Sequence, residues 1–184
     1  MATLFVDKID PQSGTSLTIG SSGDTVALTS GVVQSNLNYP AFRATMSATQ
    51  SLSDDTRVLV AYDTVEYDTD NAYTNTSSNY KFTVPSGKDG KYVIYAQAYG
   101  DSQADSNLSH VELNIYKNGS MLTNNETLFN SNYINRTTQA IFLTLDLNAS
   151  DYIQIYLRVN DTSGSPQIEN DDNQNWFGAY RIGS

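Results

Sequence analysis

Two short segments that alternate apolar and polar residues, joined by a turn that starts with proline and contains glycine, constrain this chain more than any other feature. In the first segment Tyr80, Phe82 and Val84 share one face, because successive side chains of a strand point to opposite sides. Pro85 cannot donate a backbone hydrogen bond, so it marks the end of that strand. The polar, glycine-containing stretch that follows reverses the chain, and a second alternating strand begins at Lys91. The pair predicts a β fold.

Composition supports strands and excludes several classes of protein. The chain has 184 residues, enough for one sizeable core, and thirteen tyrosines favour strands over helices. There is no cysteine, which excludes disulfides and thiolate chemistry. A net charge of −10 argues against nucleic acid as a partner. No apolar run reaches the about 18 residues of a membrane span, and the first residues lack the basic start and long apolar middle of a signal peptide.

Alternation predicts eight strands after Tyr39, with polar connections and no helices. In the strand over 91–99, Tyr92 and Ile94 share one face and Tyr95 and Tyr99 share the other. Regular short strands of this kind are typical of an antiparallel β-sandwich or jelly roll. Asn118-Gly119 predicts a hairpin, and residues 148–151 predict a turn of the same kind. The expected strands are residues 41–46, 57–62, 80–84, 91–99, 110–117, 138–145, 152–159 and 176–182.

Residues 1–38 differ from the rest because they contain few aromatics and several glycines. Their alternating pieces are too short to bury a face alone. We expect an extended arm that either docks on another protein or winds together with two copies of itself, and a floppy tail is the alternative. The apolar residues expected to anchor this arm are Leu4, Phe5, Val6, Ile9, Leu17, Ile19, Val26 and Leu28.

The sequence offers little support for catalysis or for bound ions. His110 is the only histidine and begins an expected strand, so we interpret it as a surface residue and not a catalytic base. Asp63, Glu66, Asp68 and Asp70 lie close in sequence, as a glycosidase carboxylate pair could, but nothing places two of them in a cleft. The acidic loops 68–71, 101–105 and 169–173 lack a complete calcium-loop pattern and are interpreted as solvated charges. We therefore expect no enzyme activity, no catalytic residue, no cofactor and no metal.

The order of motifs from residue 39 to 184 resembles the globular head of the C1q/tumour-necrosis-factor superfamily. The resemblance rests on Ala41-Phe42-Arg43-Ala44, Phe82-Thr83-Val84-Pro85, Gly90-Lys91-Tyr92-Val93-Ile94, Lys117-Asn118-Gly119, Ser150-Asp151 and Phe177-Gly178-Ala179-Tyr180. Ile94 replaces the usual aromatic, and the last glycine comes one place early. The resemblance implies an all-β, antiparallel jelly-roll β-sandwich that forms a homotrimer. The aromatics expected in its core or trimer contacts are Phe42, Phe82, Tyr92, Tyr95, Tyr99, Phe177 and Tyr180.

The segments 4–15 and 17–26 resemble the leading segments of structural proteins from tailed bacteriophages, especially marine ones. No collagen-like Gly-X-Y stalk is present. Together the two resemblances imply a virion protein, made in the host cytoplasm and displayed on the particle. We expect a capsid decoration or cement protein whose residues 1–38 bind the major capsid protein or another virion protein. A tail-fibre or receptor-binding tip that contacts host surface glycans is one alternative, and a bacterial or secreted C1q-like lectin is another.

Overall fold

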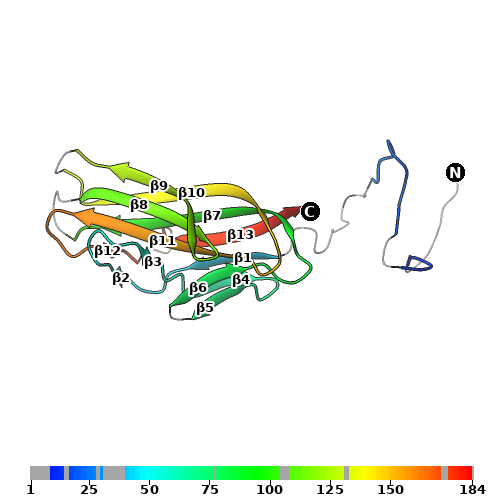
Figure 1. The fold of residues 1–184 in the computed structure, drawn as a ribbon, viewed down its shortest axis with the longest axis horizontal. Helices are drawn as coiled ribbons and strands as arrows, with labels where there is room; N and C mark the ends of the chain where they lie inside the picture. The colour runs from blue at the N-terminus through cyan, green and yellow to red at the C-terminus, as the bar shows by residue number, and fades with distance from the viewer. Residues whose placement is uncertain are drawn as a thin grey trace. The chain divides into compact units, whose positions relative to one another are not determined.

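The computed structural model describes residues 9–14, 17–27, 30, 40–76, 78–103, 108–130, 133–170 and 174–183. The chain divides into two compact units, Met1–Ser35 and Asn36–Ser184. Every regular element of the described residues is a β-strand (Figure 1). No helix long and apolar enough to span a membrane occurs among the described residues.

The second unit contains two antiparallel sheets. In the first sheet the strand order is β2-β12-β7-β13-β1-β4, and β10 pairs with the other side of β7. The second sheet has the order β5-β6-β11-β8-β9, with β3 also paired to β11. The first sheet's strands are β1 (Ala41–Thr45), β2 (Gln50–Ser51), β4 (Thr64–Asp68), β7 (Gly90–Asp101), β10 (Arg136–Leu147), β12 (Gln167–Ile168) and β13 (Trp176–Gly183). The second sheet's strands are β3 (Val58–Leu59), β5 (Tyr73–Thr76), β6 (Asn79–Thr83), β8 (Leu108–Lys117), β9 (Ser120–Leu128) and β11 (Tyr152–Asp161).

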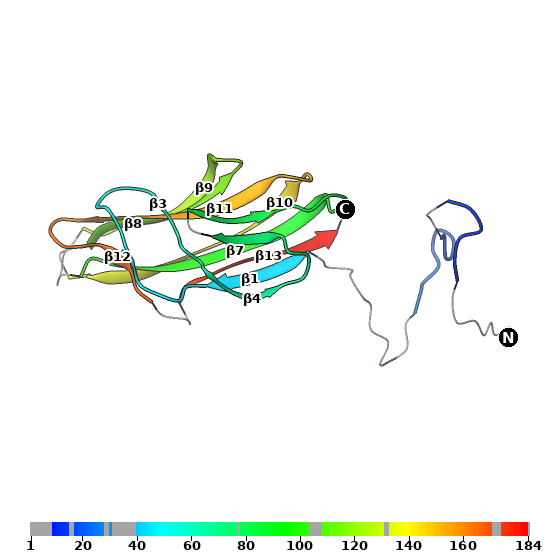
Figure 2. The same cartoon turned by 90° about the horizontal axis from the view of Figure 1, so that it is seen from below.

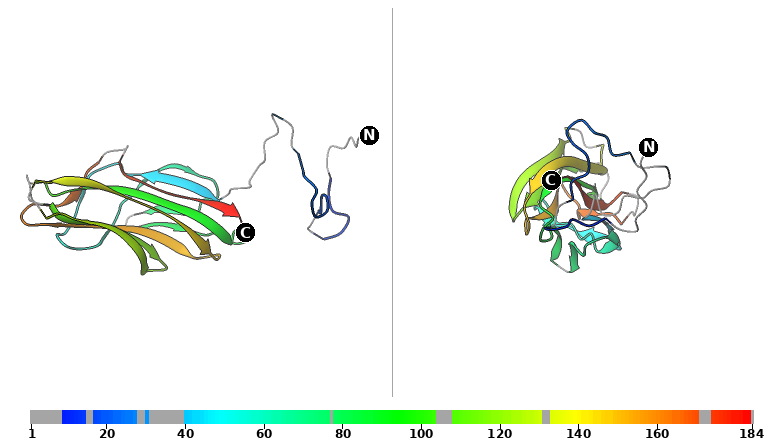
Figure 3. Two further views of the ribbon diagram at one scale, coloured as in Figure 1. Left: turned by 90° about the horizontal axis from the view of Figure 1, so that it is seen from above. Right: turned by 90° about the vertical axis from the view of Figure 1, so that its right-hand side faces the viewer.

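The last strand of the chain lies in the middle of the first sheet. β13 is paired on one side with β7 and on the other with β1, so it separates them (Figures 2 and 3). β10 runs along the opposite side of β7 from Arg136 to Leu147. The broad face formed by β10, β7, β13, β1 and β4 carries the site described below.

Aromatic rings from both sheets meet in the core around Phe42. Phe42 of β1 stacks on Tyr73 and Phe82 of the second sheet, with ring centroids 4.6 and 5.1 Å away. Phe177 of β13 meets it edge-on at 4.9 Å. Phe82 in turn contacts the ring of Tyr92. Aromatic pairs in these geometries are favourable beyond the area that they bury, so this cluster joins the two sheets.

The expected all-β, antiparallel sandwich is confirmed, with shifted strand ends. The strand predicted at residues 57–62 is too long, because only Val58–Leu59 forms a strand, which pairs with β11. β2, β4, β5, β9 and β12 were not predicted from the residue pattern. β9 shows why: most of its side chains are exposed on both faces, so an edge strand of this kind has little apolar alternation to detect.

Of the predicted reversals, one is a hairpin and two are not. Asn118 and Gly119 have φ of 52° and 79°, and they join β8 to its partner β9 as predicted. Residues 148–151 also form a turn, but β10 and β11 belong to different sheets, so the predicted hairpin is wrong there. The reversal after Pro85 likewise leads from β6 in the second sheet to β7 in the first. Alternation of apolar and polar residues indicates that a segment is a strand, but it does not indicate which other strand that segment pairs with.

The described residues of the first unit form turns and irregular chain. The backbone amide of Asp24 donates to the carbonyl of Ser21, and the amide of Ser21 donates to the Asp24 carboxylate. Ile9, Leu17, Ile19 and Val26 are between 45% and 64% exposed. The other expected anchoring residues, Leu4, Phe5, Val6 and Leu28, lie outside the described residues.

Asp151 ties the turn between β10 and β11 to the β8–β9 hairpin. Its carboxylate accepts hydrogen bonds from the Asn118 side chain at 2.7 Å and the Asn148 amide at 2.9 Å, and it pairs with Lys117 at 2.8 Å. Desolvation of this carboxyl raises its pKa, but the bonds from Lys117, Asn118 and Asn148 together outweigh it and lower the pKa to about 2.

Asp151→Asn should therefore remove a pH-dependent part of the stability. Because the folded-state pKa lies below the ordinary 3.8, the ionised carboxylate favours the folded state above that pH. This contribution is lost as the pH falls toward about 2. Urea unfolding from pH 7 to 2 should show a steeper acid loss in the wild type than in the variant. Asp146→Asn, at a carboxylate 77% exposed, is the control, and equal acid slopes for all three proteins would contradict the prediction.

Candidate functional site

One row of residues crosses five strands of the first sheet at the same level. In register order it runs Tyr67 (β4), Arg43 (β1), Gly178 (β13), Tyr95 (β7) and Phe142 (β10). Phe42, Ile94 and Phe177, which lie next to members of this row along the chain, are fully buried. Because side chains alternate along a strand, the row points away from the core.

Gly178 provides the space in which the Tyr95 side chain lies. A Cβ atom at residue 178 would overlap the ring and the hydroxyl of Tyr95. The ring therefore crosses over the backbone of β13, and the Tyr95 hydroxyl reaches to 3.3 Å from the Tyr67 hydroxyl. The glycine that departs by one place from the family pattern thus has a local role, because any larger residue would displace this ring.

Further aromatic rings surround Tyr95. Its ring centroid lies 5.6 Å from that of Trp176 and 6.3 Å from those of Phe142 and Tyr180. Phe142 is 66% exposed and Tyr180 is 37% exposed. The group encloses a shallow hollow of about 430 Å³. We call this surface the aromatic patch; it is formed by Arg43, Tyr67, Val93, Tyr95, Phe142, Trp176 and Tyr180.

The aromatic patch carries almost no net charge. Arg43 is the one charged residue that lines it, and its guanidinium pairs with the Glu66 carboxylate. Desolvation raises the pKa of Tyr95, and the hydrogen bond with Tyr67 raises it further, so this phenol stays neutral at physiological pH. Covering an apolar, neutral surface of this kind with another apolar surface lowers the free energy.

The expected aromatics divide between the core and this face. Phe42, Phe82, Tyr92 and Phe177 are fully buried in the core. Tyr95 and Tyr180 belong to the aromatic patch. Tyr99 lies further along β7, where its hydroxyl accepts a hydrogen bond from Arg136 and takes no part in the patch.

Four residues of the patch were not predicted to take part in it: Arg43, Tyr67, Phe142 and Trp176. A signal was present for Phe142, because Ile141, Phe142 and Leu143 are consecutive apolar residues and one of any two neighbours in a strand must face outward. Arg43 and Tyr67 gave no signal, since their place beside Tyr95 depends on strand order.

The acidic residues considered for catalysis or calcium are each held by separate partners. Asp63 accepts bonds from Ser47, Glu66 pairs with Arg43, and Asp70 lies 3.8 Å from Lys88. The Asp68 carboxylate accepts the amides of Ala72 and Tyr73. The described parts of the three acidic loops form no three-ligand group, whereas His110 does so with two glutamates elsewhere. His110 lies on strand β8, and its side chain is only 12% exposed, so neighbouring side chains cover it more than expected of a surface residue.

A second hollow, of about 450 Å³, lies against the second sheet. Tyr80 and Tyr156 line it together with the amide side chain of Gln50. The Tyr156 ring is also 4.3 Å from that of Tyr116. We call it the tyrosine groove, lined by Gln50, Val58, Leu59, Ala61, Ser78, Tyr80 and Tyr156.

Comparison with known proteins identifies the fold. No protein-family model and no curated protein sequence matches this chain significantly. Solved structures do match. The globular domain of zebrafish complement 1qA protein has a TM-score of 0.53 at 15% identity over 78% of this chain and 97% of its own. Murine APRIL gives 0.56 at 11% identity over 77% and 98%. Eiger TNF from S. frugiperda gives 0.50 at 14% identity over 78% and 91%.

The second unit, Asn36–Ser184, has the C1q/TNF-like jelly-roll fold, and we call this unit the head. The expectation drawn from the ordered motifs between residues 39 and 184 is thereby confirmed for the architecture. At these identities the likeness concerns the fold alone, and a phage origin of the N-terminal segment stays a prediction.

Gly178→Ala should displace the Tyr95 ring and destabilise the protein. Overpacking of this kind costs about 1–3 kcal/mol, measurable as a lower urea midpoint. Trp176 is the only tryptophan, so its fluorescence reports the change at the patch directly. Gly183→Ala on the same strand has open space around its Cβ and should be neutral.

The effect of Gly178→Ala should also depend on Tyr95. In a Tyr95→Ala background the overlapping ring is gone, so adding Gly178→Ala should cost little more. If the losses of stability caused by the two substitutions were fully additive, the proposed packing of the Tyr95 ring over Gly178 would be contradicted.

Proposed function

We propose that this chain is a non-enzymatic binding protein whose head forms a homotrimer through the aromatic patch. The single observation that carries the proposal is the row of outward side chains from Tyr67 to Phe142 across five strands. The core already contains its own aromatic cluster around Phe42, so the patch is not needed to fill the protomer. The homotrimer is the assembly that the family resemblance implies.

Electrostatics favours contact at the patch and opposes it over most of the remaining surface. Each chain carries a net charge of −10, so copies repel one another in general. At the patch the guanidinium of Arg43 is matched by Glu66, and the rest of the lining is neutral. Tyr and Trp are the residues that contribute most to interfaces, because they bury a large apolar area and keep a polar tip.

A closed ring of three needs two different surfaces on each chain, since threefold contacts are head-to-tail. The edge strand β9 offers the second surface. Its exposed apolar residues Met121, Leu122 and Leu128 are 49%, 44% and 72% exposed. β9 lies beside β10, where the Asn125 amide donates to the Ala140 carbonyl at 2.9 Å. We infer that this edge of one copy packs against the aromatic patch of the next.

Phe142→Asp combined with Tyr180→Asp should yield a folded monomer. Both side chains are already partly exposed, so the protomer tolerates the change. Assembly would bury two new carboxylates at each of the three interfaces, which opposes it. Sedimentation equilibrium should give three times the 20.2 kDa chain mass for the wild type and one chain mass for the variant. Tyr133→Asp, at a residue 86% exposed, should remain trimeric. A monomeric wild type at micromolar concentration would refute the assembly.

We further propose that the trimer is a bacteriophage capsid decoration or cement protein, with residues 1–38 as its anchor. The phage-like segments support this role, and so do the exposed apolar residues Ile9, Leu17, Ile19 and Val26 of the arm. Isolated apolar side chains spaced by glycines cannot form a core of their own. They gain stability when a partner surface covers them. Three arms on one head multiply weak individual contacts through a high effective concentration.

Deleting residues 1–35 should leave the head folded and trimeric but unable to join particles. The head is a separate compact unit that begins at Asn36, so its sheets do not need the arm. Incorporation is measured by mixing purified protein with particles that lack it, followed by sedimentation. Undiminished incorporation of the truncated trimer would refute the anchor. A truncated protein that loses the trimer would instead assign the arm to self-association.

The tyrosine groove favours a second candidate, a tail-fibre or receptor-binding tip that contacts host glycans. Sugar rings stack on tyrosine faces, and amide side chains hydrogen-bond their hydroxyls. Tyr80, Tyr156 and Gln50 bring these groups together in the groove. Binding of the isolated head to host cells would favour this candidate over the cement role.

A further inference from the structure

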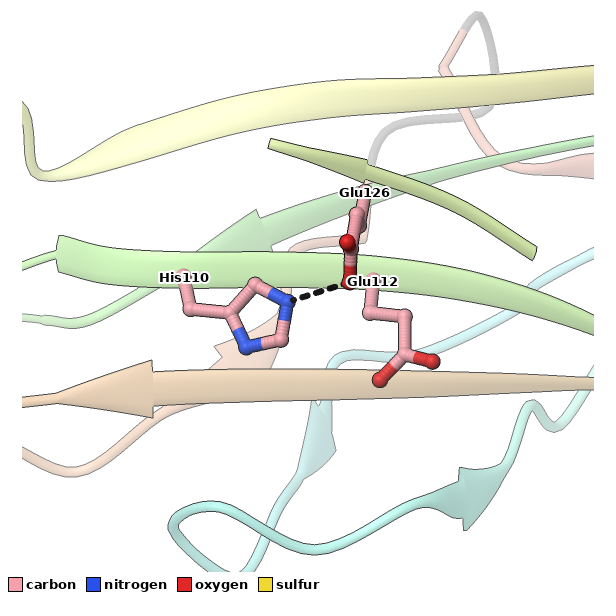
Figure 4. A group of neighbouring side chains, drawn as sticks. All are labelled: His110, Glu112 and Glu126. Atoms are coloured by element: carbon pink, nitrogen blue, oxygen red, sulfur yellow. Dashed lines mark ion pairs between the residues drawn. The ribbon is translucent and has the colours of Figure 1, made fainter. Parts of the chain in front are cut away.

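His110, Glu112 and Glu126 gather on the outward face of the second sheet (Figure 4). His110 and Glu112 lie two residues apart on β8, so they share a face. Glu126 on β9 is directly opposite Glu112 in the register. Candidate ligand atoms of the three side chains lie within 4.8 Å of one another.

Nε2 of the His110 imidazole points into this group and contacts the Glu126 carboxylate. Nε2 is buried, and it has no hydrogen-bond partner. The Glu126 carboxylate oxygen lies 3.4 Å away without hydrogen-bond geometry (Figure 4). Two ligands bound to one ion at about 2.0–2.1 Å in tetrahedral geometry are separated by a similar distance, so the gap suits a shared ion.

Glu112 is held ionised and in place from the other side. Its carboxylate is 1% exposed and pairs with Arg57 at 2.9 Å and Arg158 at 3.3 Å. The Asn124 amide donates a further hydrogen bond at 3.0 Å. Desolvation raises the pKa of Glu112, but the bonds from both arginines and Asn124 outweigh it and lower the pKa overall.

We propose that His110, Glu126 and Glu112 form a binding site for a transition-metal ion of the zinc class. His110 Nε2 and Glu126 are the first ligands, and Glu112 joins by exchanging the Asn124 hydrogen bond for the ion. Histidine with two carboxylates suits zinc, and a fourth position remains for water. Calcium and magnesium are disfavoured because they prefer oxygen ligands alone, whereas His110 offers a nitrogen.

The bound ion would stabilise an edge of the head. Among the described strands β9 pairs through its backbone with β8 alone, and its contact with β10 rests on side-chain hydrogen bonds such as that from Asn125 to Ala140. Glu112 and Glu126 face each other with like charge, which disfavours that pairing. An ion bound between the two carboxylates would replace this repulsion with attraction. It would thereby stabilise the pairing of β9, the strand that carries Met121, Leu122 and Leu128, with β8. The proposal does not depend on the virion role.

The composition makes the experiment unusually clean. The chain has one histidine and no cysteine, so imidazole-dependent binding can arise only at His110. The full-length protein, purified without a polyhistidine tag, is titrated with Zn²⁺ by calorimetry and by thermal melting. A single ion per chain should bind, and the melting temperature should rise by several degrees. Mg²⁺ and Ca²⁺ should leave it unchanged.

His110→Asn and Glu126→Gln should each weaken Zn²⁺ binding by about tenfold or more and abolish the melting shift. Asp146→Asn removes a carboxylate 77% exposed on β10 and should bind Zn²⁺ like the wild type. X-ray absorption should show one imidazole among nitrogen and oxygen ligands. If His110→Asn fails to fold by circular dichroism, Glu126→Gln decides the question, because that side chain is 49% exposed. No Zn²⁺ binding, or equal binding by Glu126→Gln, would overturn the proposal.

Discussion

The stacking of aromatic rings across the two sheets around Phe42 is the contact on which the head depends. Phe42 lies on the first strand, its stacked partners Tyr73 and Phe82 come from the opposite sheet, and Phe177 comes from the last strand. These four rings fix the sheets at one spacing and one alignment. Once they are buried, the alternation of each strand determines which side chains must face outward. The position of the aromatic patch therefore follows from the core. Arg43 and Tyr95 directly follow the buried residues Phe42 and Ile94 in the chain, so their side chains must face outward.

The outward faces of the two sheets differ in chemistry. The first sheet presents neutral rings seated over Gly178, which suits contact with another apolar surface. On the second sheet the ionised groups Glu112, Arg57 and Arg158 form a satisfied network beside His110. Such a network resists being covered by an apolar partner, since its groups are already bonded to one another. The fold thus separates a face suited to self-association from one suited to polar ligands.

The strands that were predicted correctly are those whose alternation records a buried face, such as the ones containing Phe82, Tyr92 and Phe177. Short edge strands such as β2 and β12 were missed because two paired residues leave no periodic pattern. The site was predicted only through Tyr95 and Tyr180. Its other members meet through strand order, which brings β4, β1 and β10 to the same face from distant parts of the chain. His110 was misjudged for a similar reason, because its neighbour Glu126 belongs to a strand that alternation did not reveal.

The central position of β13 has a consequence for how the head is made. β1 is among the earliest strands of the head to leave the ribosome, yet one of its two partners is the last. Until residues 176–183 emerge, the sheet has a gap between β1 and β7, and Phe42 lacks the ring of Phe177. Pairings this distant in sequence fold slowly. Trp176 and Tyr180 of the aromatic patch belong to β13, so this outward face is incomplete until β13 has been synthesised and paired. The surface that presents the rings therefore forms late, together with the last contact of the core.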